Sequence, residues 1–381
     1  MTLRSGACPV KKILIISHEI PPVGGGAGAV ALEHARRVAS AGFHVDLVTT
    51  KQARRAGSRA LSEETSRISI HEVGVFRKSN SGTRLRELAL FILRGILTVR
   101  RIYRRQGATA IHAHGLVPSA LVLLAAKTPT RIVTVHGSDV PGFNRDKFRA
   151  PHVLLKPLAR LLATRLDAVI CPSPLMDNLV ERLNPKSRRV TIPNGIELST
   201  MPFIARPNPR AILVAARLER RKQVGLLLEA LDLIDNPIVV HVMGDGPERP
   251  RLERLAEGLQ GPHTVLFHGW VHRNSRQWRE LYESAALSAS LGAFENAPIT
   301  ALEALATGHA LVASDIDAHR PLRGPTTSLV DPSPASVAAG LEQFLSRTPD
   351  EILSDANTSR SMISAQFAWE RVIDRYLQLY M

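Results

Sequence analysis

The sequence predicts an α/β protein with two doubly wound domains, each a parallel sheet covered by helices on both faces. Three observations predict this fold. Short apolar runs alternate with amphipathic stretches along the chain, the alternation stops at a turn-rich stretch near residue 200, and it then restarts. The length of 381 residues suits two domains that each bury a core. We expect ligands at the carboxyl ends of the strands, where both domains would face one cleft.

The first domain is expected over residues 1–198. Its first strand, residues 12–16, is an uninterrupted apolar run, which is typical of a strand buried on both faces. A helix over 27–41 and a strand over 44–49 follow. Four more short apolar runs predict the remaining strands of this domain, at 110–112, 131–135, 168–171 and 189–192.

The second domain is expected over residues 199–365, after a linker. Prolines and glycines between residues 193 and 209 show no periodicity, which indicates a connecting segment. Five apolar runs then predict strands at 211–214, 238–242, 264–267, 287–290 and 310–313. Helices centred near residues 228, 255, 281, 302 and 341 separate and follow them.

Composition narrows the class of protein. Two cysteines, Cys8 and Cys171, exclude a disulfide scaffold and suit a reducing compartment. No apolar run reaches the ~20 residues that cross a bilayer. The longest candidate, residues 88–99, is short and carries Arg94, and residues 1–10 lack the apolar core of a signal peptide. We therefore expect a soluble, cytoplasmic chain.

The net charge of +15 is concentrated in one half of the chain. Residues 1–200 hold 31 Lys and Arg against 13 Asp and Glu, whereas the remainder holds 18 against 21. Either the first half meets an anionic surface, or its surface is simply well solvated. A nucleic-acid-binding protein is disfavoured, because aromatic residues make up only 4% and no basic–aromatic interleaving is present.

Four glycines, at positions 24, 25, 26 and 28, follow the first predicted strand. Glycines let a backbone approach a ligand closely, and the next helix offers its N–H groups to a phosphate. Gly24, Gly26 and Ala29 also satisfy a dinucleotide-binding fingerprint, so an NAD-dependent oxidoreductase remains an alternative. However, residues 17–23 separate the strand from the first glycine, which that fingerprint does not favour.

Two cations, Arg217 and Lys222, follow the first strand of the second domain. Positive charge at the carboxyl end of a strand, beside a helix N-terminus, suits a diphosphate whose departure creates negative charge. A solvated basic loop would have the same sequence pattern, so both interpretations stay open.

Two carboxylates, Glu295 and Glu303, flank the start of a predicted helix. Pro298 suits the first helical turn, which would place Glu295 in the loop and Glu303 farther along the inner face. One carboxylate can bind sugar hydroxyls and the other ribose, while the amides between them bind phosphate. Alternatively, Glu295 is solvated and Glu303 is an acidic residue favoured near a helix N-terminus.

The ordered set of motifs resembles the retaining, nucleotide-sugar-dependent glycosyltransferases of family 4, which have the two-domain GT-B fold. The resemblance covers nearly the whole chain and rests on a series in one order: Gly-Gly after Pro-Pro at 21–25, Ile-His-Ala-His-Gly at 111–115, Thr-Val-His-Gly-Ser-Asp at 134–139, Cys-Pro-Ser at 171–173, Ile-Pro-Asn-Gly-Ile-Glu at 192–197, Arg217 with Lys222, Met-Gly-Asp-Gly-Pro at 243–247, Phe-His-Gly at 267–269 and Glu295 with Glu303. Residues 366–381 are similar to the terminal helix with which that family crosses back onto its first domain.

The resemblance implies a role for each matching residue. In the first domain it implies that the backbone of Gly24 and Gly25 approaches the donor diphosphate and that His136 lies beside the donor sugar. In the second domain it implies that Arg217 and Lys222 bind the diphosphate.

The acidic motif of the second domain takes the remaining roles that the resemblance implies. Glu295 lies near the donor sugar and Glu303 holds the ribose hydroxyls. The loop between them lines the sugar and phosphate with Asn296, Ala297, Pro298 and Ile299. The sequence departs from the family at 316–320, where a Gly-Gly loop is usual, and at 291–294. At these positions the resemblance does not define the sugar specificity or, to a lesser extent, the donor affinity.

The expected function is transfer of a hexosyl unit from a UDP-sugar or GDP-sugar to a saccharide or lipid-linked saccharide, with retention, in polysaccharide or glycolipid biosynthesis. A catalytically inactive sugar-nucleotide-binding relative remains an alternative. We expect no obligatory metal, since no carboxylate cluster has metal-ligand spacing. Basic, apolar stretches at 83–105 and 151–165 suggest contact with an anionic membrane face, although ordinary core helices with basic ends would look the same.

Overall fold

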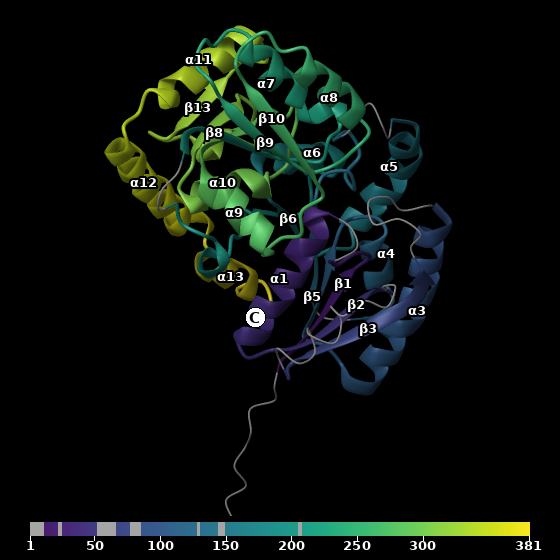
Figure 1. The fold of residues 1–381 in the computed structure, drawn as a ribbon. Helices are drawn as coiled ribbons and strands as arrows, with labels where there is room; N and C mark the ends of the chain where they lie inside the picture. The colour runs from purple at the N-terminus through teal and green to yellow at the C-terminus, as the bar shows by residue number, and fades with distance from the viewer. Residues whose placement is uncertain are drawn as a thin grey trace, which may run out of the picture. The chain divides into compact units, whose positions relative to one another are not determined.

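The computed structural model describes residues 11–21, 25–51, 66–76, 85–127, 130–143, 149–204 and 208–381. It divides into two compact units (Figure 1). Unit 1 comprises Met1–Asn194 with Val372–Met381, and unit 2 comprises Gly195–Arg371. The predicted fold class is confirmed, because each unit is built on one sheet of parallel strands with helices around it.

Unit 1 contains a seven-stranded sheet in the order β3-β2-β1-β4-β5-β6-β7. Its strands are β1 (Lys12–Ser17), β2 (His44–Lys51), β3 (Ile68–Phe76), β4 (Ala110–His114), β5 (Thr130–Thr134), β6 (Ala168–Cys171) and β7 (Arg189–Thr191). Its helices are α1 (Gly26–Ser40), α3 (Leu85–Gln106), α4 (Ser119–Leu123), α5 (Arg149–Ala163) and α6 (Pro174–Leu183). The central strand β1 pairs with β2 on one side and β4 on the other, both in parallel register.

Successive side chains of β1 point to opposite faces of the sheet, and both faces are buried. Leu14 and Ile16 join an apolar core with residues of α3, α4, α5 and α6. The other face carries polar side chains in its centre, His112 and His114 of β4, which are nevertheless 0% and 2% exposed. In unit 1 a buried polar cluster therefore lies on the sheet face opposite this apolar core, among buried apolar residues such as Ile13 and Ile15.

Unit 2 contains a six-stranded sheet in the order β10-β9-β8-β11-β12-β13. Its strands are β8 (Asn208–Ala215), β9 (Val239–Met243), β10 (Thr264–Gly269), β11 (Ala285–Ser290), β12 (Ala310–Ser314) and β13 (Thr327–Val330). Its helices are α7 (Val224–Leu231), α8 (Arg249–Glu257), α9 (Arg276–Ser284), α10 (Ile299–Thr307), α11 (Pro334–Leu345) and α12 (Pro349–Phe367), and α13 (Trp369–Leu377) begins in this unit and ends in unit 1. Short 3₁₀ turns occupy Leu198–Thr200, Arg220–Lys222 and Arg320–Leu322.

Both faces of the unit 2 sheet are apolar. Ile212 and Val214 of β8 pack with residues of α7, α8 and α11, whereas Ala211 and Leu213 pack with residues of α9, α10 and α12. Figure 1 shows the two sets of helices on opposite sides of the sheet. This arrangement explains the unbroken apolar run at residues 211–215 of β8.

Two strands, β3 and β13, lie outside the sequence-based expectations. β3 is an edge strand in which buried Ile68, Val73 and Val75 are interspersed with exposed residues. A strand with one solvated side alternates in polarity instead of forming a continuous apolar run. β13 is the other kind of exception, an edge strand of four residues.

Unit 2 begins and ends on paired backbone segments. Ile196 donates its N–H to the carbonyl of Phe367 at 2.8 Å, and its carbonyl accepts from Trp369 at 3.1 Å. Gly195 is required beside this pair, because a Cβ there would lie 2.4 Å from the Trp369 ring. The first and last segments of the unit are thereby joined to each other.

Candidate functional site

The site residues of unit 2 lie where the strand order of its sheet reverses. β8 and β11 are neighbours, and the chain continues outward from them in opposite directions. Such a switch point leaves a crevice at the carboxyl ends of the strands. The loop after β8 carries Arg217 and Lys222, and the loop after β11 carries Glu295. The two loops are tied together, since Ala293 donates its N–H to the carbonyl of Arg221 at 2.8 Å.

Glycines after β9 hold the cationic loop in place. A Cβ on Gly244, whose φ is +141°, would lie 1.8 Å from the carbonyl oxygen of Ala216, and a Cβ on Gly246 would lie 2.4 Å from that of Leu218. Leu218 also donates its N–H to the carbonyl of Asp245 at 2.9 Å. The Gly-Asp-Gly sequence therefore allows the loop that carries Arg217 to pack directly on backbone.

Glu295 is a buried carboxylate held by cations. Its Oε1 forms an ion pair with Lys222 Nζ, and its Oε2 lies 3.7 Å from Arg221. A Cβ on Gly292 would lie 2.8 Å from Glu295 Oε1, so any larger residue there would displace this carboxylate. The exposed fraction of Glu295 is 8%. Removing one member of such a pair leaves the other charge buried and unpaired, which is costly.

Arg217 is not part of this pair. Its guanidinium lies 3.6 Å from Glu219 and its side chain is 34% exposed. Arg221 bridges the two carboxylates, at 2.9 Å from Glu219 and 3.7 Å from Glu295. Sequence reasoning named Arg217 and Lys222 but missed Arg221, although the Arg-Arg-Lys run at 220–222 contained the signal.

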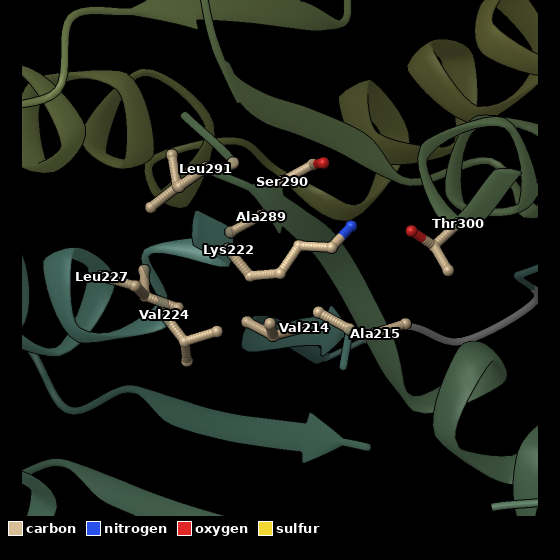
Figure 2. A pocket seen from close by; sticks show the side chains of 11 residues that line it. Val214, Ala215, Lys222, Val224, Leu227, Ala289, Ser290, Leu291 and Thr300 are labelled. Atoms are coloured by element: carbon tan, nitrogen blue, oxygen red, sulfur yellow. The ribbon is translucent and has the colours of Figure 1, made fainter. Parts of the chain in front are cut away.

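A shallow hollow that is open to solvent lies between these loops. Its lining includes Lys222, Ser290 and Thr300 together with apolar residues of β8, α7 and β11. Figure 2 shows the Lys222 amine directed toward the space between the hydroxyls of Ser290 and Thr300. A cation and two hydroxyl groups therefore converge on one side of an otherwise apolar hollow.

The predicted donor-binding loop, Asn296 to Ile299, leads into the start of α10. Asn296 is buried like Glu295, Pro298 occupies the N-cap position, and α10 begins at Ile299. No side chain caps this helix, whose first turn also carries Thr300 of the hollow. The N–H groups and dipole of a helix N-terminus favour anions.

Glu303 lies in α10 with a cation and a donor of its own. Arg273 Nε is 2.7 Å from Glu303 Oε1, and the Tyr282 hydroxyl donates to Oε2 at 3.0 Å. Burial and the neighbouring carboxylate raise the pKa of Tyr282 well above its usual value, so this hydroxyl stays protonated. The structure thus gives Glu295 and Glu303 separate partners. Arg273 had no distinguishing sequence signal.

His319 lies in the stretch where the sequence departs from the family pattern. Its Nδ1 donates to the carbonyl of Ser314 at 2.9 Å, so its Nε2 accepts from the Ser290 hydroxyl at 3.2 Å. Burial lowers the pKa of His319, and the charges of Glu295 and Lys222 act on it in opposite directions. In the stretch that departs from the family pattern, the neutral imidazole of His319 therefore accepts a hydrogen bond from Ser290, whose hydroxyl lines the hollow.

Unit 1 contains the other predicted residues. Gly24 lies outside the described residues, and Gly25 precedes α1 with its N–H 3.4 Å from a Glu19 carboxylate oxygen. His136 follows β5, and its backbone N–H donates to Asp139 at 2.9 Å. Its ring Nε2 shares a hydrogen bond of 3.0 Å with His114 Nδ1. Burial lowers the pKa of His136, while Asp139 and Glu19 oppose that effect.

Comparisons with known proteins agree with this architecture. The "Glycosyltransferase Family 4" model matches residues 24–200, and the "Glycosyl transferases group 1" model matches residues 202–362. Together with two parallel-sheet units and a site at a strand switch point, they define a GT-B glycosyltransferase. The chain belongs to the family 4-type glycosyltransferases.

Relatives and solved structures give further similarities. The alpha-monoglucosyldiacylglycerol synthase of Streptococcus pneumoniae is 24% identical over 246 residues, covering 58% of this chain and 55% of that protein. The chain thus matches about half the length of this curated relative. The sucrose-phosphate synthase structure from Thermosynechococcus elongatus has a TM-score of 0.79 at 19% identity, covering 97% and 98% of the two chains. Anabaena HepE in complex with UDP and glucose has a TM-score of 0.71 at 17% identity, covering 97% and 98%. At these identities the solved structures support the fold alone.

Proposed function

We propose that the protein transfers a hexosyl unit from a UDP-sugar or GDP-sugar to a hydroxyl of a saccharide or lipid-linked saccharide, in polysaccharide or glycolipid biosynthesis. The observation that carries the proposal is the cation cluster Arg217, Arg221 and Lys222, which follows β8 at the switch point beside the N-terminus of α10. The Anabaena structure, which holds UDP and glucose, supports a nucleotide-sugar donor. The pneumococcal relative, named as a glycolipid synthase, supports a lipid-linked acceptor.

The cations supply what the leaving diphosphate requires. Negative charge grows on the diphosphate as the bond to the anomeric carbon breaks, and preorganised cations and amide donors stabilise that charge. In the structure Lys222 forms an ion pair with Glu295. A diphosphate in the hollow would compete with Glu295 for the Lys222 amine, which leaves Glu295 available to the sugar hydroxyls. Glu303, which lies about one turn after the start of α10, would bind the ribose.

Retention follows in this proposal from the leaving group. We assign no general base, since in this proposal Glu295 binds the sugar hydroxyls, and Glu303, which is paired with Arg273, binds the ribose. The departing phosphate takes the acceptor proton on the face from which it leaves. No obligatory metal is part of the proposal, because side-chain cations neutralise the diphosphate. Proton NMR of the anomeric signal tests retention, and activity in excess EDTA tests the metal requirement.

The first experiment is a thermal-shift titration with UDP, GDP, ADP and NAD⁺. A bound ligand at a hundredfold excess over Kd stabilises by about 2.7 kcal/mol. We expect a shift with one nucleoside diphosphate, and its loss in Glu303→Ala. The matched control is Glu280→Ala, which removes a carboxylate of the same unit whose ion pair with Arg276 is exposed. A shift with NAD⁺ alone, or with none of the four, contradicts the proposal, and binding without turnover indicates an inactive relative.

We further propose that α3 of unit 1 contacts an anionic membrane that carries the acceptor. Leu90, Leu93 and Leu97 form a stripe on this helix and are 41%, 62% and 64% exposed. Exposed arginines flank the stripe on the same helix, and the first half of the chain carries the excess of positive charge. A basic helix with exposed apolar residues suits the interface of an anionic bilayer.

Vesicle flotation tests this contact. Among the described helices, none combines the length and apolar character needed to cross a bilayer. We therefore expect peripheral binding to phosphatidylglycerol vesicles that decreases with salt and is lost in a Leu93→Ser/Leu97→Ser variant. The matched control is Leu233→Ser, an exposed leucine of unit 2. Equal flotation of all three proteins would contradict the contact.

A further inference from the structure

Unit 1 contains a cluster of buried histidines and tyrosines that the proposed chemistry does not use. His34 of α1, His112 and His114 of β4, and Tyr380 near the end of the chain are each 2% exposed or less. One ring nitrogen from each of the three histidines lies within 4.8 Å of one from each of the other two. Burial lowers the pKa of His34 to about 3 and lowers the pKa values of His112 and His114 well below 6.5. All three imidazoles are therefore neutral at pH 7.

These groups form one continuous hydrogen-bonded chain that ends at His136. Thr134 Oγ1 bonds to His112 Nε2 at 2.8 Å, and His112 Nδ1 bonds to the Tyr380 hydroxyl at 2.5 Å. The same hydroxyl bonds to His34 Nε2 at 2.9 Å. The last two links are between the rings themselves: His34 Nδ1 to His114 Nε2 at 2.9 Å, and His114 Nδ1 to His136 Nε2 at 3.0 Å.

Proton counting constrains this chain. Each neutral histidine has one N–H and one acceptor nitrogen, and each hydroxyl has one proton. Every bond needs one proton, and each bond has one when all donors point along the chain in the same direction. If they point toward His136, the proton of every histidine is on Nδ1; if they point away from it, every proton is on Nε2. In one mixed arrangement the Tyr380 hydroxyl accepts from both His112 and His34, which leaves its own buried proton out of the chain. Every other mixed arrangement places two protons, or two lone pairs, against each other at a buried bond, and both alternatives are costly.

We infer that His34, His112, His114 and His136 share one tautomer, and that His34 and Tyr380 are positioning residues that impose it on His136. The ring nitrogen of His136 outside the chain is Nδ1, so the shared tautomer decides whether that atom donates or accepts a hydrogen bond. This inference rests on the proposed function only where it places His136 beside the donor sugar. A zinc ion on the three histidines is the competing interpretation, but it would have to break bonds that both nitrogens of each ring already make.

The groups around His136 act on the same ring. Asp139 and Glu19 favour a proton on it, His18 opposes one, and burial opposes its positive charge. His34 is affected by burial and by His136. A tautomer measurement therefore needs a pH at which the rings are neutral, and pH 7.5 meets this condition.

Long-range ¹H–¹⁵N NMR of histidine-labelled protein at pH 7.5 tests the inference directly. Two histidines of unit 2 serve as internal standards. His309 donates from Nε2 to the carbonyl of Tyr282, and His319 donates from Nδ1 to that of Ser314. We expect the four chain histidines to match one standard throughout. Mixed tautomers overturn the inference, and so does one equivalent of bound zinc that is lost in His34→Gln.

Kinetics test the positioning role. Tyr380→Phe removes only the hydroxyl that links His112 to His34, and we expect kcat/KM to fall about tenfold, as for one lost hydrogen bond. His34→Leu should lose at least as much, and His34→Gln, which keeps a donor and an acceptor, should recover part of it. The matched control is His241→Gln, which breaks a 3.0 Å histidine–histidine bond in unit 2. Unchanged kcat/KM in folded Tyr380→Phe and His34→Leu would overturn the role, whereas absence of any transfer in the parent protein would count against the proposed function and leave the NMR result to decide.

Discussion

The buried histidines of the two units are held in different ways. In unit 2, His309 and His319 each donate to a backbone carbonyl, so each has its tautomer fixed locally. In unit 1, the hydrogen-bonded chain that begins at Thr134 and ends at His136 joins histidine nitrogens to one another and to hydroxyl groups. No single bond of this chain fixes which of its two partners is the donor. The difference shows two ways to fix the tautomer of a buried histidine. A backbone carbonyl fixes one ring by itself, whereas a hydrogen-bonded chain fixes several rings together and so connects positions that are distant in the sequence.

The two units differ in charge as well. Unit 1 bonds the ring of its predicted His136 to the neutral imidazole of His114, whereas unit 2 holds its predicted carboxylates with cations. A set of closely spaced opposite charges suits a site where a charged ligand replaces one partner of an ion pair. A neutral hydrogen-bonded chain suits a site where only direction and position matter. The predictions below change one property at a time.

The largest effect is expected from the charge in unit 2. Lys222→Ala removes the cation that faces the hollow, and we expect turnover to fall about a thousandfold, the equivalent of about 4 kcal/mol. Steady-state transfer to a saccharide acceptor measures it, with Arg276→Ala as control, because that arginine is 92% exposed in the same unit. If the two variants have similar rates, the assignment of Lys222 is wrong.

The next effect concerns the backbone that supports the charged loop. Gly244→Ala forces a Cβ against the carbonyl of Ala216 at a positive φ. We expect the free energy of unfolding to fall by about 3 kcal/mol. Gly258→Ala is the control, since its φ is −88° and the nearest atoms to its Cβ would be 3.6 Å away. Urea denaturation compares the two, and equal midpoints would exclude the tight packing.

A smaller effect isolates one hydrogen bond to a charged group. Tyr282→Phe removes the hydroxyl that donates to Glu303 and leaves the buried ring in place. We expect the free energy of unfolding to fall by about 2 kcal/mol, because bonds to ionised groups are worth more than neutral ones. The same denaturation assay measures it. A loss below the error of the assay would show that Arg273 alone satisfies Glu303.

The smallest effect is a pH dependence from unit 1. The pKa of His34 is lowered to about 3 in the folded protein, so below its ordinary value of 6.5 the unfolded chain binds a proton that the folded chain does not. Its stabilising contribution is complete above pH 6.5 and decreases as the pH falls toward 3, by up to about 1.4 kcal/mol per pH unit. Urea midpoints between pH 7.5 and 5 should therefore fall less steeply in His34→Gln. Parallel slopes would contradict a neutral, buried His34.

The sequence signal was clearest where burial is symmetrical. Strands such as β1 and β8 are apolar on both faces, which makes a continuous pattern, whereas β3 and β13, each at an edge of its sheet, produce none. The other two edge strands, β7 and β10, were expected from short apolar runs. The α1 helix was expected, but His34 within it was not singled out. A single histidine among apolar helix positions gives no signal until the sheet brings His112 and His114 beneath it.

The candidate site shows the same limit. Lys222 and Glu295 were both named from motifs and do meet in the structure. The cations Arg221 and Arg273 were missed, because their partners are set by how loops distant in sequence approach each other. Short motifs identify residues that chemistry requires, whereas partners supplied by loop packing need the fold.

The joined ends of unit 2 have a consequence for how the protein can be divided. Ile196 bonds to Phe367 and Trp369 on the opposite end of that unit. Contacts within unit 2 therefore compensate the entropic cost of holding its two ends together, and the rest of the chain need not do so. Residues 195–371 accordingly have the properties of an inserted module with adjacent ends. A short linker across those ends would give a circularly permuted unit, and its binding of nucleoside diphosphates could be measured without unit 1.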